Sequence, residues 1–461
     1  MVTIVTSSRE SAATAHRSPV SAYLIRSAVV ASFCGLLFGF EIAVISGATD
    51  WLKAHFALSD FMLGFTVASA LIGAIVGSVA VAKPTDVIGR RGVLFGLAAL
   101  FLVASTGCAL AWNLGAFLAF RFLGGVAVGG ASVVAPVYIA ELSPAAYRGR
   151  LVTITQLNIV AGILLAYLSN YLIGRMDLGD TEARWMFGVM AVPSAIFFVM
   201  LFFTPQSPRW LIARGRIAEA KKVFEKCGTD AGSVEEEIVE IQRSYDLAHH
   251  QASEPLFQRK YSKPIAMAVA IAAFNQLSGI NAVLYYAGHI FKMAGADKAS
   301  ALLQSVIVGV TLLVFTLVAL AAIDSSGRRR LMLIGSVGYI LSLAATSYSF
   351  YSGHGGWLLL ASLLTFVASH AVGQGAVIWV FIGEIFPNRV RASGQALGSL
   401  THWVMSALVS WTFPIIAAGS AHVAFAFYAL CMVAQLLWVV FIMPETRGES
   451  LEAIQRRLGI E

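Results

Sequence analysis

Charged residues are scarce in this sequence. Asp, Glu, Lys and Arg make up 12% of the 461 residues, whereas an average soluble domain has about 25%. Hydrophobic residues reach 58%, well above the roughly 45–50% of a soluble domain. The composition excludes an ordinary soluble protein and predicts one that spans a membrane several times.

Cysteines and the motifs of enzymes are equally rare. The four cysteines are Cys34, Cys108, Cys227 and Cys431, and their spacing fits neither a metal site nor a disulfide framework. No phosphate-binding glycine loop or nucleophile elbow stands in a plausible context. We therefore expect a protein that is not an enzyme and needs no cofactor or metal.

The sequence has instead a series of apolar stretches, each close to the roughly 20 residues that span a bilayer. They lie at 27–50, 59–82, 93–112, 115–141, 151–174, 185–204, 264–291, 300–323, 331–351, 357–384, 394–418 and 421–443. This pattern predicts an all-α membrane protein with twelve transmembrane helices in two six-helix halves, 27–204 and 264–443. The segment 205–263 is predicted to be a linker of short helices, at 217–227 and 234–247, and 1–26 and 444–461 form tails.

Basic residues are unequally distributed between the two sides of this predicted bundle. Of the 32 Lys and Arg residues, 26 fall in the tails and loops of one side and five on the other. The five are Lys53, Arg175, Arg184, Lys292 and Lys298. Because cytoplasmic loops retain positive charge, both termini are predicted to be cytoplasmic. The net charge of +7 reflects this topology and requires no nucleic-acid partner.

Two motifs occur twice at nearly the same offset. Asp86 opens a motif that ends in Gly-Arg-Arg, and Asp324 opens a second copy 238 positions later. Glu141 and Glu384 open a second pair of motifs, 243 positions apart, and each is followed by an arginine. Two unrelated motifs at one half-length period indicate a duplicated membrane protein.

Two ionisable residues fall inside predicted spans. Glu41 and Arg121 both lie roughly 9–14 Å below the outer surface, at 1.5 Å per residue, so they could pair across a helix interface. Intramembrane charges are costly and usually functional. The pair is either a permanent structural ion pair or a proton site, in which Glu41 is protonated in one step and paired with Arg121 in another.

The seventh span carries an unusual density of amides, Asn275, Gln276 and Asn281, beside Gly279. Amides donate and accept hydrogen bonds at once, which suits a hydroxyl-rich ligand. Gln276 and Asn281 lie about 140° apart on an ideal helix, so they share a face only if the helix breaks or tilts at Gly279. The alternative is that these amides join helices to one another.

Further polar and aromatic residues fall in other spans: Gln156, Trp379, His402 and Trp403. An indole face can stack on the C–H face of a pyranose while its N–H donates a hydrogen bond. A membrane Trp is otherwise an interfacial anchor or a packing residue. Together with the amides, these residues describe a neutral polar cavity flanked by aromatic rings.

The chain resembles the sugar porters of the major facilitator superfamily from about residue 24 to 452. The motifs that carry the resemblance are Phe-Gly-Phe-Glu at 38–41, Ser-Pro-Arg-Trp-Leu at 207–211, Gln-Leu-Ser-Gly-Ile-Asn at 276–281, Pro-Glu-Thr-Arg-Gly at 444–448 and the two Gly-Arg-Arg loops. The resemblance implies a twelve-helix alternating-access carrier for monosaccharides. It implies sugar ligands at Gln156, Gln276, Asn281 and Trp379, with Phe38, Tyr285 and Trp403 near the pocket.

The resemblance also implies a cytoplasmic charge network that can latch the two halves together when the carrier faces outward. Its members are Asp86, Arg90, Arg91, Glu141 and Arg148 in the first half, and Asp324, Arg328, Glu384 and Arg391 in the second. Gln206 replaces the Glu that is usual in the first half, so we expect the first latch to be the weaker one.

Other departures bear on coupling and on the choice of sugar. Proton-coupled members of the family usually carry Asp where this chain has Glu41, and passive members a neutral residue. Because Glu keeps the titratable group, proton symport is favoured over passive uniport. Asn275 replaces a frequent Gln, and His402 a frequent Gln or Asn, so the sugar preference stays open.

The leading hypothesis is a proton-coupled importer of a hexose or pentose in a cytoplasmic membrane, working as a monomer. Glu41 would carry the proton, Arg121 would switch its affinity, and the amides of the seventh span would hold sugar hydroxyls. The alternatives are a passive uniporter, a sugar sensor that does not transport, and an exporter of other metabolites.

Overall fold

The computed structural model describes residues 21–460, apart from 145–146, 229–230, 251–253, 354–355, 388 and 450. Within these residues every regular element is helical. Eleven helical stretches are long and apolar enough to cross a membrane, and one of them crosses it twice, as described below. The predicted all-α fold is therefore confirmed.

The N-terminal half contains six spans. They are α1 (Ala22–Val44), α3 (Asp60–Ala80), α4 (Ala82–Leu110), α5 (Leu114–Leu142), α6 (Arg148–Gly174) and the pair α7 (Glu182–Gly188) and α8 (Ala191–Met200). Glycines set how closely these helices pack. A Cβ on Gly39 of α1 would lie 1.8 Å from the carbonyl oxygen of Ile159 on α6, and one on Gly125 of α5 would lie 1.9 Å from that of Ala70 on α3. Side chains at these positions would force the helices apart.

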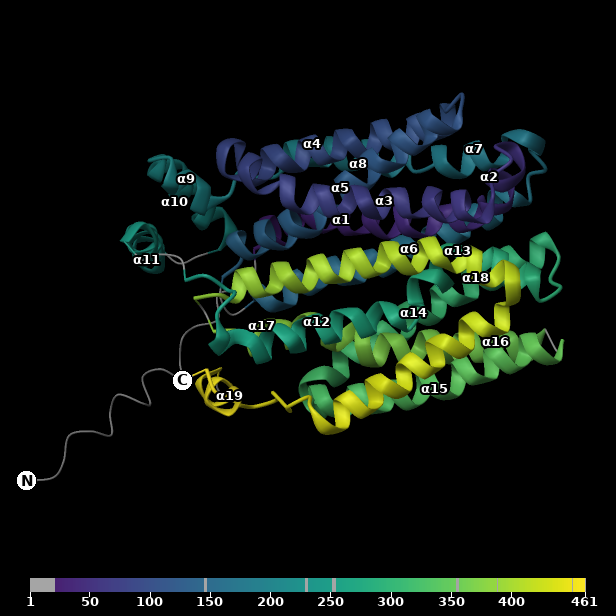
Figure 1. Ribbon diagram of the computed structural model, residues 1–461. Coiled ribbons are helices and arrows are strands. Elements are labelled where there is room, and N and C mark those ends of the chain that lie inside the picture. Colours follow the sequence, from purple (N-terminus) through teal and green to yellow (C-terminus); the bar gives the residue numbers. More distant parts are fainter. Residues whose placement is uncertain are drawn as a thin grey trace, which may run out of the picture.

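The C-terminal half repeats this plan with more interruptions. Its helices are α12 (Ser262–Leu277), α13 (Ile280–Met293), α14 (Lys298–Ser326), α15 (Arg328–Ser352), α16 (Trp357–His370), the π-helical turn η5 (Ala371–Gly375), α17 (Ala376–Ile385) and α18 (Arg391–Phe441). The 51 residues of α18 include a kink at Ser420, where the backbone is extended (φ −173°, ψ 109°). Figure 1 shows that the chain reverses its direction within α18, so this element supplies the last two of the twelve spans.

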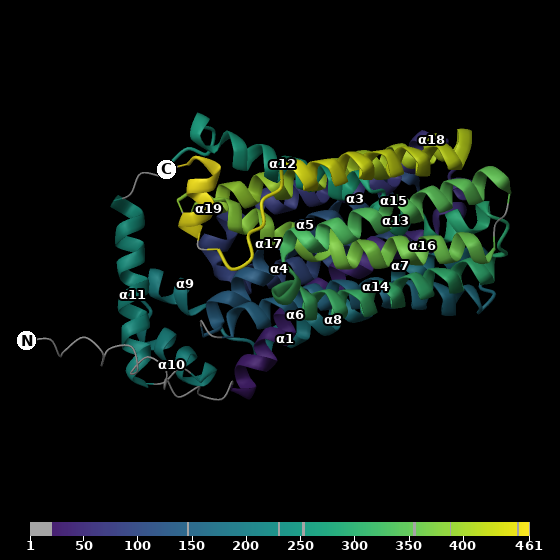
Figure 2. The same ribbon diagram turned by 90° about the horizontal axis from the view of Figure 1, so that it is seen from below.

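Short helices gather at one end of the bundle, which we call the linker end. They are α9 (Pro208–Ala213), α10 (Ile217–Cys227), α11 (Ala231–His250) and α19 (Leu451–Leu458) (Figures 1 and 2). A small apolar cluster that includes Leu211, Phe224 and Ile238 holds α9, α10 and α11 together. The two linker helices expected from the sequence are confirmed, and α11 is longer at both ends. The opposite end, which we call the loop end, carries α2 (Thr49–His55) (Figure 1).

The two halves meet mainly where α3 packs on α18 and α6 packs on α14, and where α13 packs on α1, the turn Ile45–Gly47 and α2. One close approach of the backbones is near the loop end, where a Cβ on Gly64 would lie 2.0 Å from the carbonyl oxygen of Trp411. In the part of the chain that the structure describes, every hydrogen bond or ion pair joining a residue of one half to a residue of the other lies in the loop-end part of the bundle.

Candidate functional site

Glu41 of α1 and Arg121 of α5 form a buried ion pair between Oε1 of the carboxylate and Nη1 of the guanidinium. The side chain of Arg121 is 0% exposed and that of Glu41 is 7% exposed. The pairing predicted from their similar depth is confirmed, while a role in proton transfer stays a prediction. The pair is incomplete, because Nε and Nη2 of Arg121 are buried and have no hydrogen-bond partner.

A glycine one turn along α5 makes room for the carboxylate. A Cβ on Gly124 would lie 2.9 Å from Oε1 of Glu41. Glu41 also lines a cavity of about 10 Å³, together with Tyr285 and Trp403. That volume is close to the roughly 10–15 Å³ needed to hold one water molecule. The ion pair therefore borders a water-sized space that reaches residues of the C-terminal half.

The seventh span is broken between α12 and α13, as expected from its amide pattern. Gly279 takes φ +83°, a conformation that L side chains rarely adopt, and it separates the two helices. The break turns Asn281 back toward Gln276, so that Asn281 Nδ2 donates to Gln276 Oε1 over 2.8 Å. Tyr428 packs against the break, since a Cβ on Gly279 would lie 2.5 Å from its ring.

The amides form one hydrogen-bonded cluster with residues of α18. Gln276 Nε2 donates to Asn275 Oδ1 over 2.7 Å and to His402 Nε2 over 2.8 Å. Asn281 Nδ2 lies 2.5 Å from Ser406 Oγ. Because Gln276 is the donor to His402 Nε2, the ring proton of a neutral His402 is on Nδ1, which is buried without a partner. The cluster thus supplies hydrogen-bond partners to itself, and a ligand would bind by exchanging them.

Ser406 was not singled out by sequence reasoning. It lies one helical turn beyond His402, so the i, i+4 spacing on α18 was a usable signal.

Aromatic rings extend this cluster in two directions. Trp379 of α17 lies 5.2 Å from the ring of His402 and is 39% exposed, more than any other predicted ligand. Phe38 of α1 lies 5.7 Å from the ring of Trp403 and so bridges the two halves. Gln156 of α6 is half-buried and has no side-chain hydrogen bond to another described residue. The structure therefore brings most of the predicted ligands together but does not join Gln156 to them.

The predicted charge network of the first half lies at the linker end. Arg90 Nη2 is 2.9 Å from Glu141 Oε1, and Ser207 Oγ donates to Glu141 Oε2 over 2.5 Å. Asp86 is 3.8 Å from Arg90, with an 80% exposed side chain. Arg148 bonds to the carbonyl of Ala140 and makes no ion pair with Glu141.

The second half repeats this arrangement. Arg328 Nη2 is 2.9 Å from Glu384 Oε1, and Thr446 Oγ1 donates to Glu384 Oε2 over 2.6 Å. Arg391 Nε donates to the carbonyl of Phe386. The side chain of Asp324 lies outside the described residues. Among the contacts of the described residues, neither network joins one half to the other, so the latch between halves stays a prediction.

The two networks differ where the sequence departs from the repeat. Glu445 accepts hydrogen bonds from the backbone N–H groups of Arg328 and Arg329 at the start of α15, over 2.9 and 3.1 Å. In the first half Gln206 accepts from the backbone N–H of Arg91 over 3.1 Å, without a charge. Partial burial opposes ionisation of Glu445, but the backbone N–H groups of Arg447, Arg328, Thr446 and Arg329 outweigh it and hold the pKa of that carboxyl below its usual value. A carboxylate suits a helix N-terminus better than an amide does, in line with the weaker first latch expected above.

Sequence reasoning placed Gln206 in the first network but did not identify Ser207, Glu445 and Thr446 as members of these networks. The signal was available, because Pro205-Gln206-Ser207 recurs as Pro444-Glu445-Thr446 at the same half-length offset as the other repeats.

Arg91, which was predicted as part of the first network, joins helices. It donates to the carbonyl oxygens of Leu201 and Phe202 at the end of the sixth span. Arg329 does the same for Val439 and Val440 at the end of the twelfth. These arginines tie together the helices within each half.

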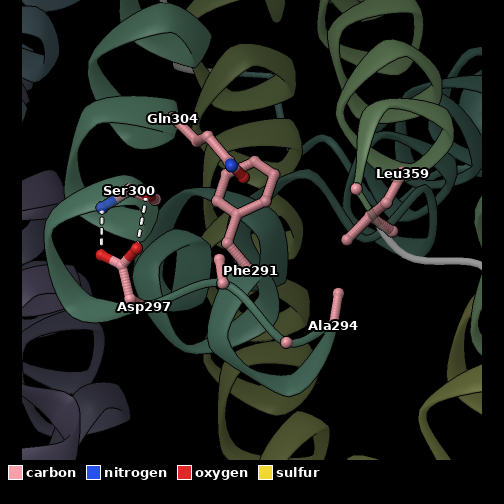
Figure 3. Close-up of a pocket in the computed structure, with 9 residues that line it drawn as sticks. Phe291, Ala294, Asp297, Ser300, Gln304 and Leu359 are labelled. Atoms are coloured by element: carbon pink, nitrogen blue, oxygen red, sulfur yellow. Dashed lines mark hydrogen bonds between the residues drawn. The ribbon is translucent and has the colours of Figure 1, made fainter.

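A larger cavity of about 280 Å³ lies at the loop end of the C-terminal half, between α13, α14 and α16 (Figure 3). Its one carboxylate, Asp297, is occupied by hydrogen bonds from Ser300, as the dashed lines show. The cavity holds none of the predicted ligands and lies apart from the amide cluster. Among the described residues no group of three His, Cys, Asp or Glu side chains is placed to hold a metal ion.

Comparisons with known proteins also indicate a sugar transporter. Residues 27–458 match the family model described as "Sugar (and other) transporter". The chain is 35% identical to the D-xylose-proton symporter of Escherichia coli (strain K12), covering 94% of this chain and 96% of the relative. It is 34% identical to the arabinose-proton symporter of Bacillus subtilis (strain 168), covering 95% and 96%. A solved structure of the xylose transporter of E. coli, in a partially occluded inward open conformation, superposes with a TM-score of 0.83 at 34% identity, over 93% of this chain and 100% of that one.

Proposed function

The chain belongs to the sugar porter family of the major facilitator superfamily, and on that basis we propose that it imports a monosaccharide together with a proton by alternating access. The linker end would face the cytoplasm, in keeping with the excess of basic residues on that side. The relatives named above are symporters of xylose and arabinose, which favours a pentose or a hexose as the substrate.

The observation that carries this proposal is the incomplete ion pair of Glu41 and Arg121. A charge buried without a partner costs several kcal/mol, so protonation of Glu41 and its separation from Arg121 are linked. The two unpartnered nitrogens of Arg121 leave it able to bond elsewhere when Glu41 is neutral. A neutral sugar carries no charge, so a separate titratable group of this kind is needed for coupling to a proton.

The small cavity beside Glu41 supports communication between the proton site and the sugar site. Tyr285 and Trp403 line it together with Glu41, and Trp403 lies on α18 one position after His402 of the amide cluster. A change in the protonation of Glu41 would therefore affect residues at the edge of the sugar site. We infer that sugar and proton together stabilise an occluded state that neither stabilises sufficiently alone.

The amide cluster accounts for recognition of hydroxyl groups. Gln276 has the nitrogen and oxygen of its amide group bonded to Asn275, His402 and Asn281. Sugar hydroxyls donate and accept in the same way, so they can replace these bonds one for one. Trp379, beside His402, would offer its ring to the apolar face of the sugar.

The test is uptake of labelled sugars into proteoliposomes with an imposed pH gradient. We expect accumulation in the direction of the proton gradient, at least one pentose or hexose that competes, and loss of accumulation in Glu41→Gln. Glu219→Gln is a matched control, because Glu219 is an exposed carboxylate of the linker that pairs with Arg216. Accumulation that persists in Glu41→Gln contradicts the proton role.

A passive uniporter is the second candidate, because a permanent ion pair of Glu41 and Arg121 would be buried in the same way. The same assay separates the two, since a uniporter equilibrates sugar whatever the pH gradient. A sensor would bind sugar without any uptake.

A further inference from the structure

We propose that an ion-pair cluster of Asp50, His289 and Lys292, with a second pair of Glu182 and Lys298, is the outer gate that holds this carrier closed at the loop end. This inference rests on the proposed function only in calling that end the outer one. The members of both pairs come from opposite halves, so the contacts exist only while the halves meet there.

The first contact joins α2 to the end of α13. Asp50 Oδ1 lies 2.8 Å from His289 Nδ1, and Asp50 Oδ2 lies 2.6 Å from Lys292 Nζ. The three side chains are between 26% and 40% exposed, so they are partly shielded from solvent. One carboxylate of the N-terminal half thus holds two side chains of the C-terminal half.

The second contact joins the start of α7 to the start of α14. Glu182 Oε2 lies 2.7 Å from Lys298 Nζ, and the Glu182 side chain is only 9% exposed. A third bond between the halves lies deeper, where Tyr167 OH donates to the carbonyl of Leu284 over 2.7 Å. The pairs therefore lie on two different helix contacts that open together if the halves separate.

Ion pairs at a surface are common, and the position of these two sets them apart. Lys53 and Asp60 are also paired at the loop end, over 2.5 Å, but both belong to the N-terminal half. Such a pair is the same in every arrangement of the halves. A pair between halves stabilises only the closed arrangement, because opening the gate separates the partners and exposes both to water.

The helix that carries His289 and Lys292 is built to move. α13 starts at the break at Gly279 and has a second non-helical residue, Tyr286 (φ −118°, ψ 18°). It packs on the 3₁₀ turn Ile45–Gly47 after α1, which leads directly to Asp50 in α2. A hinged segment whose tip is held by an ion pair can open and close the loop end.

The placement of the two lysines fits this role. Lys292 and Lys298 are two of only five basic residues on the loop side, where positive charge is sparse. Both are paired with acids of the other half. Asp50 stays ionised at neutral and mildly acidic pH, because the bonds from His289 and Lys292 outweigh burial and hold the pKa of that carboxyl below its usual value.

The experiment measures the distance across the loop end by electron paramagnetic resonance, with labels at Ala54→Cys on α2 and Ala299→Cys on α14. Asp50→Asn should raise the ratio of open to closed protein by about 2- to 25-fold, because an exposed pair shifts an equilibrium by about 1.5- to 5-fold and Asp50 makes two contacts, whose factors multiply. Glu182→Gln should add to the shift. Asp60→Asn is the matched control and should leave the ratio unchanged.

The charge-swapped double variant Asp50→Lys with Lys292→Asp should return the ratio toward that of the unmodified protein, whereas Asp50→Lys alone should not. Thermal unfolding of each variant in detergent checks that it is folded. An unchanged ratio in Asp50→Asn, an equal shift in Asp60→Asn, or a double variant no better than Asp50→Lys would overturn the gate. The distances need neither sugar nor a pH gradient, so failure of the gate and failure of proton-coupled import are separate results.

Discussion

Replacing Gly279 with Ala tests whether the break in the seventh span builds the amide cluster. Gly279 has φ +83°, and a non-glycine residue in this region costs about 1–2 kcal/mol. The new Cβ would also lie 2.5 Å from the ring of Tyr428, and overpacking of this kind costs about 1–3 kcal/mol. Together the two effects predict a loss of about 2–5 kcal/mol from the stability of the C-terminal half.

The measurements are thermal unfolding in detergent and equilibrium binding of the transported sugar. We expect a lower unfolding temperature and a loss of sugar affinity, because Asn281 no longer turns back to Gln276 when the break relaxes. Gly215→Ala separates the two causes, since Gly215 has φ +73° but nothing within 4 Å of a new Cβ. It should show only the backbone cost.

If Gly279→Ala unfolds at the same temperature as the unmodified protein and binds sugar equally well, the reasoning is refuted. A drop in stability with unchanged sugar affinity would refute the link between the break and the binding site alone.

Three further outcomes follow from the described contacts. Gly124→Ala should impair proton-driven uptake more than sugar equilibration, because its Cβ would lie 2.9 Å from the Glu41 carboxylate; comparing uptake with and without a pH gradient checks this. Ser406→Ala should weaken sugar binding about 2- to 10-fold, as expected for one lost hydrogen-bond partner of Asn281, measured by isothermal titration. Glu445→Gln should lower the unfolding temperature most near pH 7. Because the pKa of Glu445 is lowered on folding, its contribution is present above the unfolded value of about 4.3 and is lost as the pH falls through the folded value, so the difference should shrink below about pH 4.

Much of the fold followed from local rules. Apolar length predicted the spans, and depth along two helices predicted that Glu41 and Arg121 pair. The break at Gly279 followed from asking how Gln276 and Asn281 could share a face. In each case one helix, or two helices of known depth, carried enough information.

Contacts between segments that are far apart in the sequence could not be predicted from such local rules. Asp50 and His289 are 239 positions apart, and nothing in their local sequence indicates that they meet. In the sequence, Lys292 and Lys298 stand out only as two of the five basic residues on the side of the bundle that has little positive charge. Which end is closed depends on how two nearly independent halves tilt, and helix counting does not determine this.

The self-contained amide cluster has a consequence for the speed of the cycle. A carrier that has released its sugar must return empty before it can load again, and bare amides would make that return costly. Gln276 enters the return already bonded to Asn275, His402 and Asn281. If this cluster is the sugar site proposed above, side chains that take the place of sugar hydroxyls would lower the barrier for the unloaded carrier. The return of the empty carrier would then limit turnover less than it would with unbonded amides in the membrane.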